Sequence, residues 1–283
     1  MSGASNTNQS SNQATKRLIN QSTDQLINYT LHLADNTLIL CQRNAEWTGH
    51  GPILEQDIAI SNIALDLVGQ SRYLYQYAAQ LISQLTSQLI NQSTDEPITE
   101  DTLAYMRNAA DFKNCLLAEL PRGDWGFTVL RQFFFSNYQF YLYQQLQQSK
   151  DDTLAAIAVK SLKEVTYHLK WSAEWVIRLG DGTLTSHQRM QDALQKLSPF
   201  TEELLVNASY ETALATEGIA IDLATIKESW INKTKEVLAI ATLSIPEKSI
   251  VHSGGKEGKH SEYLESLLAE MQYLQRTYPN NNW

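Results

Sequence analysis

The chain has 283 residues, 43 % of them apolar and 19 % charged, and its 22 Lys and Arg against 31 Asp and Glu give a net charge of −9. This composition is typical of a folded globular protein and excludes collagen-like and wholly disordered chains. Because phosphate-binding surfaces need clustered basic residues, the acidic balance also argues against nucleic acid and anionic membranes as partners.

Residues 1–23 are predicted to form a flexible polar tail, and residues 24–283 a single domain. The tail is rich in Ser, Asn and Gln and lacks the apolar stretch of a signal peptide. No apolar run reaches the roughly 18 residues of a membrane-spanning helix, so we expect a cytoplasmic protein. The heptapeptide at residues 18–24 recurs once, at residues 89–95, which does not define a repeat protein. Cys41 and Cys115 lie in apolar helical patterns and are expected to be buried, reduced thiols.

Helical periodicity dominates the rest of the chain. Long helices are predicted over residues 24–43, 53–90, 125–148 and 151–179. Their starts carry helix-initiating residues, namely Asp24, Pro52, Asp124 and Asp151. Shorter helices are predicted over residues 102–107, 111–119, 186–205, 222–243 and 261–278, with a Gly/Lys-rich loop over residues 247–260. Since no segment alternates apolar and polar residues as a strand does, the sequence predicts an all-α fold, a four-helix bundle with additional C-terminal helices.

Aromatic side chains crowd residues 125–143 on every side of the predicted helix. Such residues form a core more often than a ligand pocket. Because they surround the helix instead of following one stripe, we expect a second buried face and hence a partner subunit.

A long four-helix bundle can hold a di-iron centre, for which two helices each supply a Glu and two supply Glu-x-x-His. Of the six histidines, only His260 follows a glutamate at this spacing, and its Glu257 lies in the Gly-rich loop. The other inward-facing candidates are Glu46, Asp66, Glu164 and His168. This set falls short of the carboxylates and imidazoles that a di-iron centre needs. We therefore predict no metal site and no catalytic residue, and we interpret these four residues as a vestigial metal-centre region.

Two other hypotheses remain open at this point. Basic residues such as Arg43, Arg72 or Lys163 are expected to pair with the acids of a vacated centre. The first alternative is an independent di-iron oxidase or hydroxylase with those four residues as atypical ligands, which requires them to converge with no Lys or Arg among them. The second is a free-standing helical scaffold that self-associates.

Several motifs carry a family resemblance. They are EWTGHGP at residues 46–52, LDLVGQSR at residues 65–72, KEVTYHL at residues 163–169 and, most specifically, SGGKEGKHSE at residues 253–262. From about residue 26 to Trp283 the chain resembles the C-subunit (PaaC-type) family of ring-1,2-phenylacetyl-CoA epoxidases.

The resemblance implies a ferritin-like fold within a multicomponent oxygenase that epoxidises the aromatic ring of phenylacetyl-CoA. It places the di-iron centre in a homologous A subunit (PaaA type), and NADPH, flavin and an iron–sulfur cluster in a reductase subunit, with a small B subunit as a bridge. The implied role of this chain is that of a non-catalytic structural subunit that binds no cofactor and that pairs with and stabilises the A subunit.

The resemblance also implies contacts to the CoA part of the substrate from two short segments. The matching positions are Asp111, Phe112, Lys113, Asn114, Thr212, Ala213 and Leu214. Asp111, Lys113 and Thr212 depart from the residue types of the family, although Lys113 is suited to meet a CoA phosphate. Ordinary helix packing is the other reading of these positions.

Overall fold

The secondary structure is helical in the part of the chain that the computed structural model describes, residues 4–90, 98–246, 250–279 and 281. The four long helices are α1 (Ala4–Ala45), α2 (Leu54–Ile90), α5 (Trp125–Leu146) and α6 (Asp152–Gly180). The shorter α-helices are α3 (Glu100–Tyr105), α4 (Leu116–Glu119), α7 (Leu184–Leu197), α8 (Ser209–Glu217), α9 (Ala224–Ile240), α10 (Glu262–Met271) and α11 (Tyr273–Thr277). The 3₁₀ helices are η1 (Ala109–Asp111), η2 (Ser198–Phe200), η3 (Glu202–Leu205) and η4 (Gly255–Glu257). Since these residues include no strand, the prediction of an all-α fold is confirmed.

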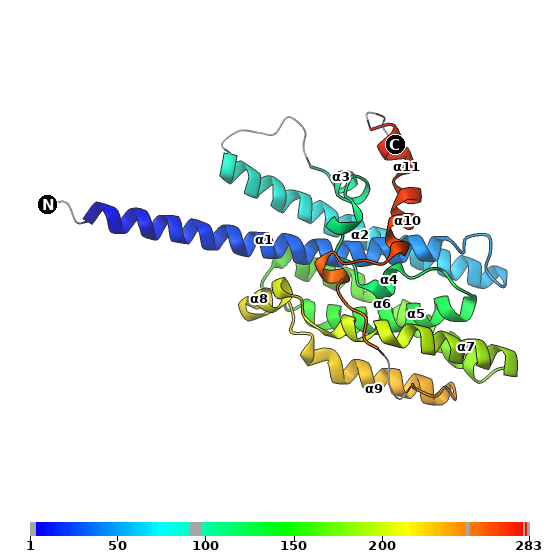
Figure 1. Cartoon of the computed structure of the whole chain (residues 1–283). Helices are drawn as coiled ribbons and strands as arrows, with labels where there is room; N and C mark the ends of the chain where they lie inside the picture. The colour runs from blue at the N-terminus through cyan, green and yellow to red at the C-terminus, as the bar shows by residue number, and fades with distance from the viewer. Residues whose placement is uncertain (1–3, 91–97, 247–249, 280, 282–283) are drawn as a thin grey trace.

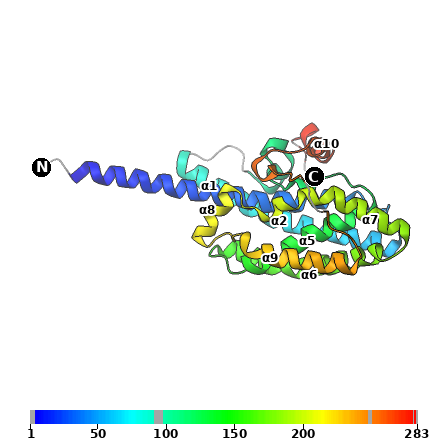
Figure 2. The ribbon, with the colours of Figure 1, turned by 60° about the horizontal axis from the view of Figure 1, so that its bottom comes forward.

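Two pairs of long helices form the body of the molecule (Figure 1). Helix α1 packs along α2, and α5 packs along α6, in the most extensive helix contacts of the fold. Helices α7 and α9 cover α5 and α6 on the side away from α1 and α2, and Figure 2 shows α9 beside α6. The C-terminal helices α10 and α11 rise near α3 on the other side of the α1–α2 pair (Figure 1).

Helix α5 lies at the centre of the core. Asp124 caps it as predicted, since its carboxylate accepts a hydrogen bond from the amide of Phe127 at 2.8 Å. On the neighbouring helix α9, the indole of Trp230 donates to the carbonyl of Phe134 at 3.1 Å. The fully buried aromatic residues of α5 are Phe133, Phe134, Phe135, Tyr138 and Tyr143. Helices α6, α7 and α9 of the same chain cover this helix, so its second buried face is present as predicted, and its aromatic residues do not require a partner subunit.

Three parts of the chain depart from the predicted helices. Residues 112–115, here called the extended segment, interrupt the helix expected over residues 111–119. The helix expected over residues 186–205 ends at Leu197, because Pro199 removes a backbone donor and only 3₁₀ turns follow. Helix α8 was not predicted, since it is short and lacks a clear apolar stripe.

Helix α1 begins at Ala4 rather than at the predicted cap, Asp24. No Gly or Pro interrupts the chain between these positions, so the helical pattern can extend towards the N-terminus. The assignment of residues 1–23 to a tail outside the domain stays a prediction. Most of the second copy of the heptapeptide, at residues 91–95, lies outside the described residues.

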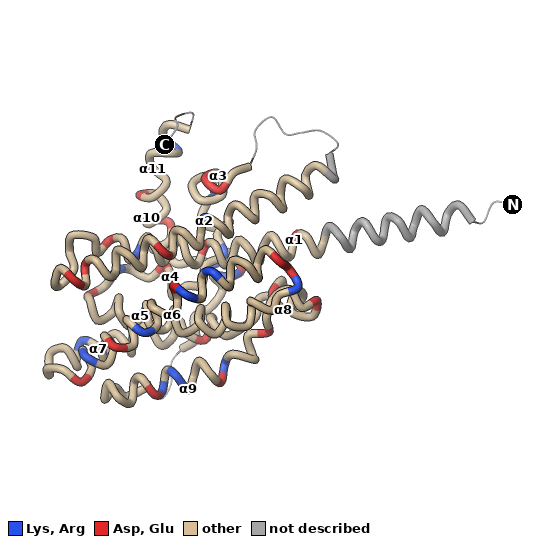
Figure 3. Tube along the Cα trace, turned by 180° about the vertical axis from the view of Figure 1, so that it is seen from behind, with Lys and Arg blue, Asp and Glu red and all other residues tan. Residues whose placement is uncertain are grey.

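Both cysteines are free thiols as predicted, with Cys115 fully buried and Cys41 partly so. Burial raises the pKa of the Cys41 thiol to about 12, so it stays protonated. None of the described helices combines the length and apolar character needed to cross a membrane. Figure 3 shows Lys and Arg interspersed with Asp and Glu along the described helices.

Candidate functional site

Most of the vestigial metal-centre region lies between α2 and α6. His168 on α6 is fully buried, and its Nε2 lies 2.9 Å from Oδ2 of Asp66 on α2. One helical turn away, Nε2 of Gln70 donates to Oε2 of Glu164 at 2.9 Å. Three of the four predicted residues thus come together, but as two hydrogen-bonded pairs that link the helices.

Glu46 lies apart from these pairs, directly after the end of α1. Its Oε1 accepts a hydrogen bond from NH1 of Arg43 at 2.6 Å, and no described contact joins it to the other three candidates. Of the other basic partners predicted, Arg72 instead lies 3.5 Å from Glu100, and Lys163 is exposed.

A buried guanidinium that the sequence reasoning missed lies on α5. Arg131 has no exposed surface, and its NH1 donates to the carbonyls of Leu120 at 2.6 Å and Pro121 at 3.2 Å. Its Nε and NH2 have no partner among the described residues. Burial, together with the charge of Arg43, lowers the pKa of Arg131 to about 9. The feature of the sequence that could have indicated this residue is a lone Arg within a helix rich in aromatic residues.

These residues do not fit the ligand set of a di-iron centre. In the described part of the chain, no group of three or more His, Cys, Asp and Glu side chains is placed to hold a metal ion. Such a centre needs carboxylates and imidazoles that point at one position. Here Asp66 binds His168, and Glu46 binds Arg43. The condition set for an independent di-iron oxidase is therefore not met.

The second candidate region is the extended segment, which runs along α1. Asp35 and Asn36 accept hydrogen bonds from the amides of Lys113 and Cys115, both at 2.8 Å. Nδ1 of His32 lies 2.7 Å from the carbonyl oxygen of Lys113 and donates to it. Because buried backbone groups must find partners, these side chains of α1 replace the hydrogen bonds of a helix.

His32 is a neutral imidazole. Burial lowers its pKa to about 4, and its Nε2 accepts a hydrogen bond from Nδ2 of Asn36 at 3.2 Å. Nε2 also lies 3.7 Å from Oε1 of Glu211, but this approach is not an ion pair because the ring is uncharged. His32 thus serves as a neutral donor that fixes the segment.

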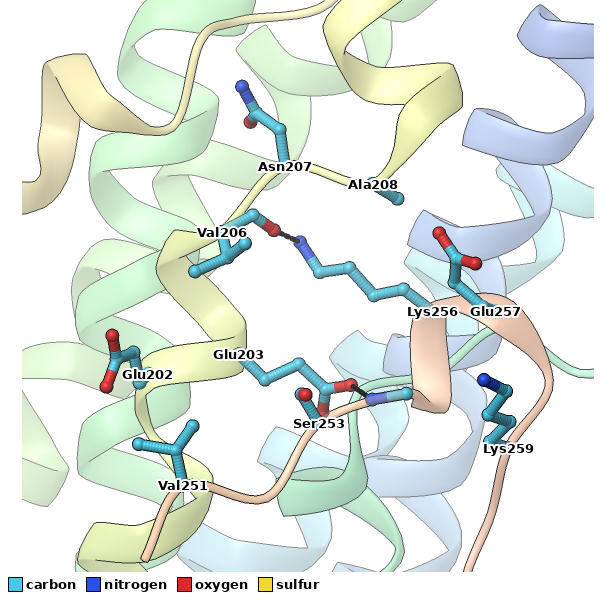
Figure 4. Close-up of a pocket in the computed structure, with 11 residues that line it drawn as sticks. Glu202, Glu203, Val206, Asn207, Ala208, Val251, Ser253, Lys256, Glu257 and Lys259 are labelled. Carbon is cyan, nitrogen blue, oxygen red and sulfur yellow. Dashed lines mark hydrogen bonds between the residues drawn. The ribbon is translucent and has the colours of Figure 1, made fainter. Parts of the chain in front are cut away.

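Residues 253–261, here called the strap, lie against the extended segment on its other side. Glu203 of η3 joins the two, since it accepts hydrogen bonds from the amides of Gly254 and Gly255, both at 2.8 Å, and from that of Leu116 at 2.7 Å. Burial raises the pKa of Glu203, although its amide donors oppose this shift. Figure 4 shows the Glu203 carboxylate at the strap.

A second buried carboxylate, Glu119 of α4, holds the end of the strap. It accepts four hydrogen bonds: from His260 at 2.7 Å, from the amide and the hydroxyl of Ser261 at 2.7 Å each, and from Asn114 at 2.9 Å. The other ring nitrogen of His260 donates to the carbonyl of Phe112 at 2.9 Å. Because both partners of the ring are acceptors, His260 is held as an imidazolium.

The strap also holds α8, the second predicted substrate segment. The ammonium of Lys256 is buried and lies 2.9 Å from Oε2 of Glu211 and 2.9 Å from the carbonyl oxygen of Val206 (Figure 4 shows the latter bond). The hydroxyl of Tyr210 donates to the carbonyl of Lys256 at 3.1 Å. Burial by itself raises the pKa of Glu211, but the charge and hydrogen bond of Lys256, the interaction with His32 and the amide of Ala208 together outweigh it and lower the pKa.

The two predicted substrate segments therefore meet beside His32, where Nζ of Lys113 lies 5.7 Å from the ring centre of Tyr210. Three of the predicted side chains are buried: Phe112, Asn114 and Leu214. Four reach the surface: Asp111, Lys113, Thr212 and Ala213. Since Lys113 carries the one positive charge in this set, it is the candidate contact for an anionic ligand. Its role, like that of the other six, stays a prediction.

A cavity of about 310 Å³ lies between the strap and the chain that leads into α8 (Figure 4). Its lining mixes apolar and charged side chains and includes Glu202, Val206, Asn207, Val251, Ser253 and Lys259. The cavity is a space beside the strap and not in the core between α2 and α6.

The stability that His260 contributes is expected to fall at alkaline pH. Burial by itself lowers the pKa of His260, but the hydrogen bond and charge of Glu119, the carbonyl of Phe112 and the charge of Asp35 outweigh it and raise the pKa above 6.5. A raised pKa in the folded chain means that the contribution is complete below pH 6.5 and is lost as the pH rises through the folded value. Urea unfolding of the wild type and of His260→Gln should show a difference that shrinks over this range. A difference that is constant with pH would contradict the imidazolium.

Comparisons with known proteins cover both candidate regions. A family model described as "Phenylacetic acid catabolic protein" matches residues 7–283. The chain is also 44 % identical over 260 residues to the C subunit of the 1,2-phenylacetyl-CoA epoxidase of Escherichia coli (strain K12). This alignment covers 92 % of the chain and 100 % of that relative.

Proposed function

The chain belongs to the family of phenylacetic acid catabolic proteins, and from this premise we propose that it is the C subunit of a 1,2-phenylacetyl-CoA epoxidase. In this role it is a structural subunit without catalytic residues of its own. The similarity to the Escherichia coli protein over that protein's full length supports the proposal.

The observation that carries the non-catalytic role is the state of the candidate iron ligands. Asp66 and His168 are bonded to each other, and Glu164 is bonded to Gln70. Each bond turns one atom of a candidate ligand toward a protein partner, and no group of three or more His, Cys, Asp and Glu among the described residues is placed to hold a metal ion. The di-iron centre of the complex therefore belongs to the homologous A subunit. We assign to both subunits a ferritin-like fold, which the pairing of α1 with α2 and of α5 with α6 supports.

An exposed apolar stripe on α2 supports the pairing with the A subunit. It consists of Leu54, Ile58, Leu65 and Val68, whose spacing places them on one side of the helix. Leu65 is 65 % exposed and Leu54 is 72 % exposed in the chain alone. Exposed apolar side chains that follow one helix face are typical of a protein–protein contact.

In the larger complex, a B subunit bridges the A–C pair and a reductase supplies electrons from NADPH through flavin and an iron–sulfur cluster. This chain binds none of these groups in our proposal. Its contribution to substrate binding is the surface that Lys113 and α8 form, where the Lys113 ammonium meets a phosphate of the CoA moiety.

Reconstitution tests the proposal. The tagged chain, co-expressed with the A, B and reductase subunits, is expected to co-purify with the A subunit and to restore epoxidation of phenylacetyl-CoA that the A subunit alone does not sustain. The purified chain should show no epoxidation by itself and far less than one iron per chain by metal analysis.

Two results would overturn it. Iron at two per isolated chain would favour the independent oxidase, despite the paired ligands. A stable homodimer that persists in light scattering when the A subunit is present would indicate that the stripe on α2 serves a second copy of the chain.

A further inference from the structure

The strap touches both segments of the candidate substrate surface. On one side His260 donates to the backbone of Phe112, and on the other Lys256 binds Glu211 of α8. Lys256 lies within the turn η4, and His260 follows four residues later in the same short loop. Helix α8 and the extended segment belong to distant parts of the sequence, so the strap is a direct physical link between them.

The extended segment is bound closely from several sides. The close approach of the strap to it leaves no room for a side chain at Gly255, where a Cβ would lie 2.3 Å from the carbonyl oxygen of Asn114. The amides of Lys113 and Cys115 are bound by α1, and that of Leu116 by Glu203. A backbone bound on both sides by buried side chains is held in one conformation.

The side chain of Lys113 depends on the strap in a second way. Its ammonium lies over the ring of Tyr210, and the hydroxyl of Tyr210 donates to the carbonyl of Lys256 in the strap. No carboxylate lies within ion-pair distance of the Lys113 ammonium among the described residues. The strap thus contacts the backbone directly before Lys113, at Phe112, and the ring of Tyr210 below its ammonium, while Asp35 and His32 of α1 bind the backbone of Lys113 itself. The charge is left available.

We propose that the strap is a positioning device for anion recognition: His260 and Lys256 are positioning residues that fix Lys113 and α8 so that the Lys113 ammonium is preorganised for a phosphate group of the CoA thioester. This inference rests on the proposed function for the identity of the anion. A preorganised cation binds an anion without the cost of ordering a long side chain, so loss of the strap contacts should weaken substrate binding and leave the chemical step in the A subunit unchanged.

The test uses the reconstituted complex with phenylacetyl-CoA and the variant His260→Gln. We expect KM to rise about tenfold with kcat changed by less than about twofold, because one charge-assisted contact loses its geometry while the reacting centre is untouched. Hydrogen exchange of the peptide that contains residues 112–116 should become faster. The matched controls are His252→Gln and Lys259→Gln, exposed residues in or beside the same loop, which should leave KM and exchange unchanged.

A double variant separates positioning from a general loss of structure. If His260 acts through Lys113, then Lys113→Gln/His260→Gln should have the same KM as Lys113→Gln alone, whereas independent effects would add. If His260→Gln does not fold, Ser261→Ala, which removes one of the four donors to Glu119, gives a smaller rise in KM of the same kind.

The outcomes distinguish this inference from the function on which it rests. Faster exchange with an unchanged KM, or additive effects in the double variant, contradicts the positioning role and leaves the proposed function intact. A wild-type chain that restores no epoxidation contradicts the proposed function and the positioning role together.

Discussion

Leu65→Glu is expected to abolish the proposed pairing of this chain with an A subunit and, with it, the epoxidation proposed for the complex. Leu65 lies in the exposed apolar stripe of α2, and Gly69 nearby leaves open space in which a partner can approach the helix closely. A carboxylate placed in such a contact must be desolvated without a partner. We expect association to weaken by about 100-fold, or roughly 3 kcal/mol, as for the loss of a central contact residue. Co-purification of the tagged chain with the A subunit and isothermal titration measure the effect.

Leu184→Glu is the matched control for this prediction. Leu184 is a leucine on the first turn of α7, is 91 % exposed and lies outside the stripe. The same change of charge there should leave association and activity as in the wild type. Equal behaviour of the two variants would show that the stripe of α2 is not the contact with the A subunit.

The sequence predicted the helical elements well where a local signal marks their ends. Asp124 and Asp151 cap α5 and α6 as expected, because their carboxylates accept hydrogen bonds from amides within the first turn. The extended segment could not be found in this way. Its apolar residues resemble those of a helix, and the side chains that hold it extended come from α1 and from the strap, which are remote in sequence.

The motifs identified the family correctly, but not what their residues do. The SGGKEGKHSE motif in the strap carried the resemblance, and the assignment to the family is confirmed. The structure shows what three residues of this motif do. Gly255 allows the backbone of the strap to approach the extended segment closely, and Lys256 and His260 pair with buried acids. The acids that hold the strap, Glu119 and Glu203 among them, lie in short apolar stretches. Their distance from the strap along the sequence follows no recognisable motif, so the sequence alone does not indicate the contacts.

The partners of the candidate metal ligands were predicted only in part. Glu46 pairs with Arg43, one of the expected basic residues, whereas Asp66 pairs with His168 instead. Arg131 was overlooked because a single cation in an aromatic helix has no periodic signal. The aromatic residues of α5 were assigned to a partner because only the tertiary fold shows that α7 and α9 cover them. Local sequence patterns do not show which distant helices will bury a given side chain.

The buried cluster around Asp35 is expected to contribute strongly to the stability of the chain. Asp35 is fully buried, and its carboxylate accepts hydrogen bonds from Tyr75 at 2.5 Å, from NH1 of Arg107 at 3.1 Å and from the amide of Lys113 at 2.8 Å. NH2 of Arg107 binds the same carboxylate, and its guanidinium lies 4.2 Å from the ring centre of Phe112. The cluster thus joins α1, α2 and the extended segment through one negative charge.

Asp35→Leu should lower the free energy of unfolding by about 3–5 kcal/mol, because it leaves the guanidinium of Arg107 in the interior without its counter-charge. Asp35→Asn keeps an acceptor oxygen but not the charge, and an intermediate loss is expected. The control is Arg72→Gln, which breaks the pair with Glu100 on the surface, where Arg72 is 69 % exposed, and should cost no more than about 1 kcal/mol. Urea unfolding followed by circular dichroism compares the three variants with the wild type. A loss below about 1 kcal/mol for Asp35→Leu would mean that Arg107 turns to solvent when its partner is removed, so that the cluster places the extended segment without stabilising the fold.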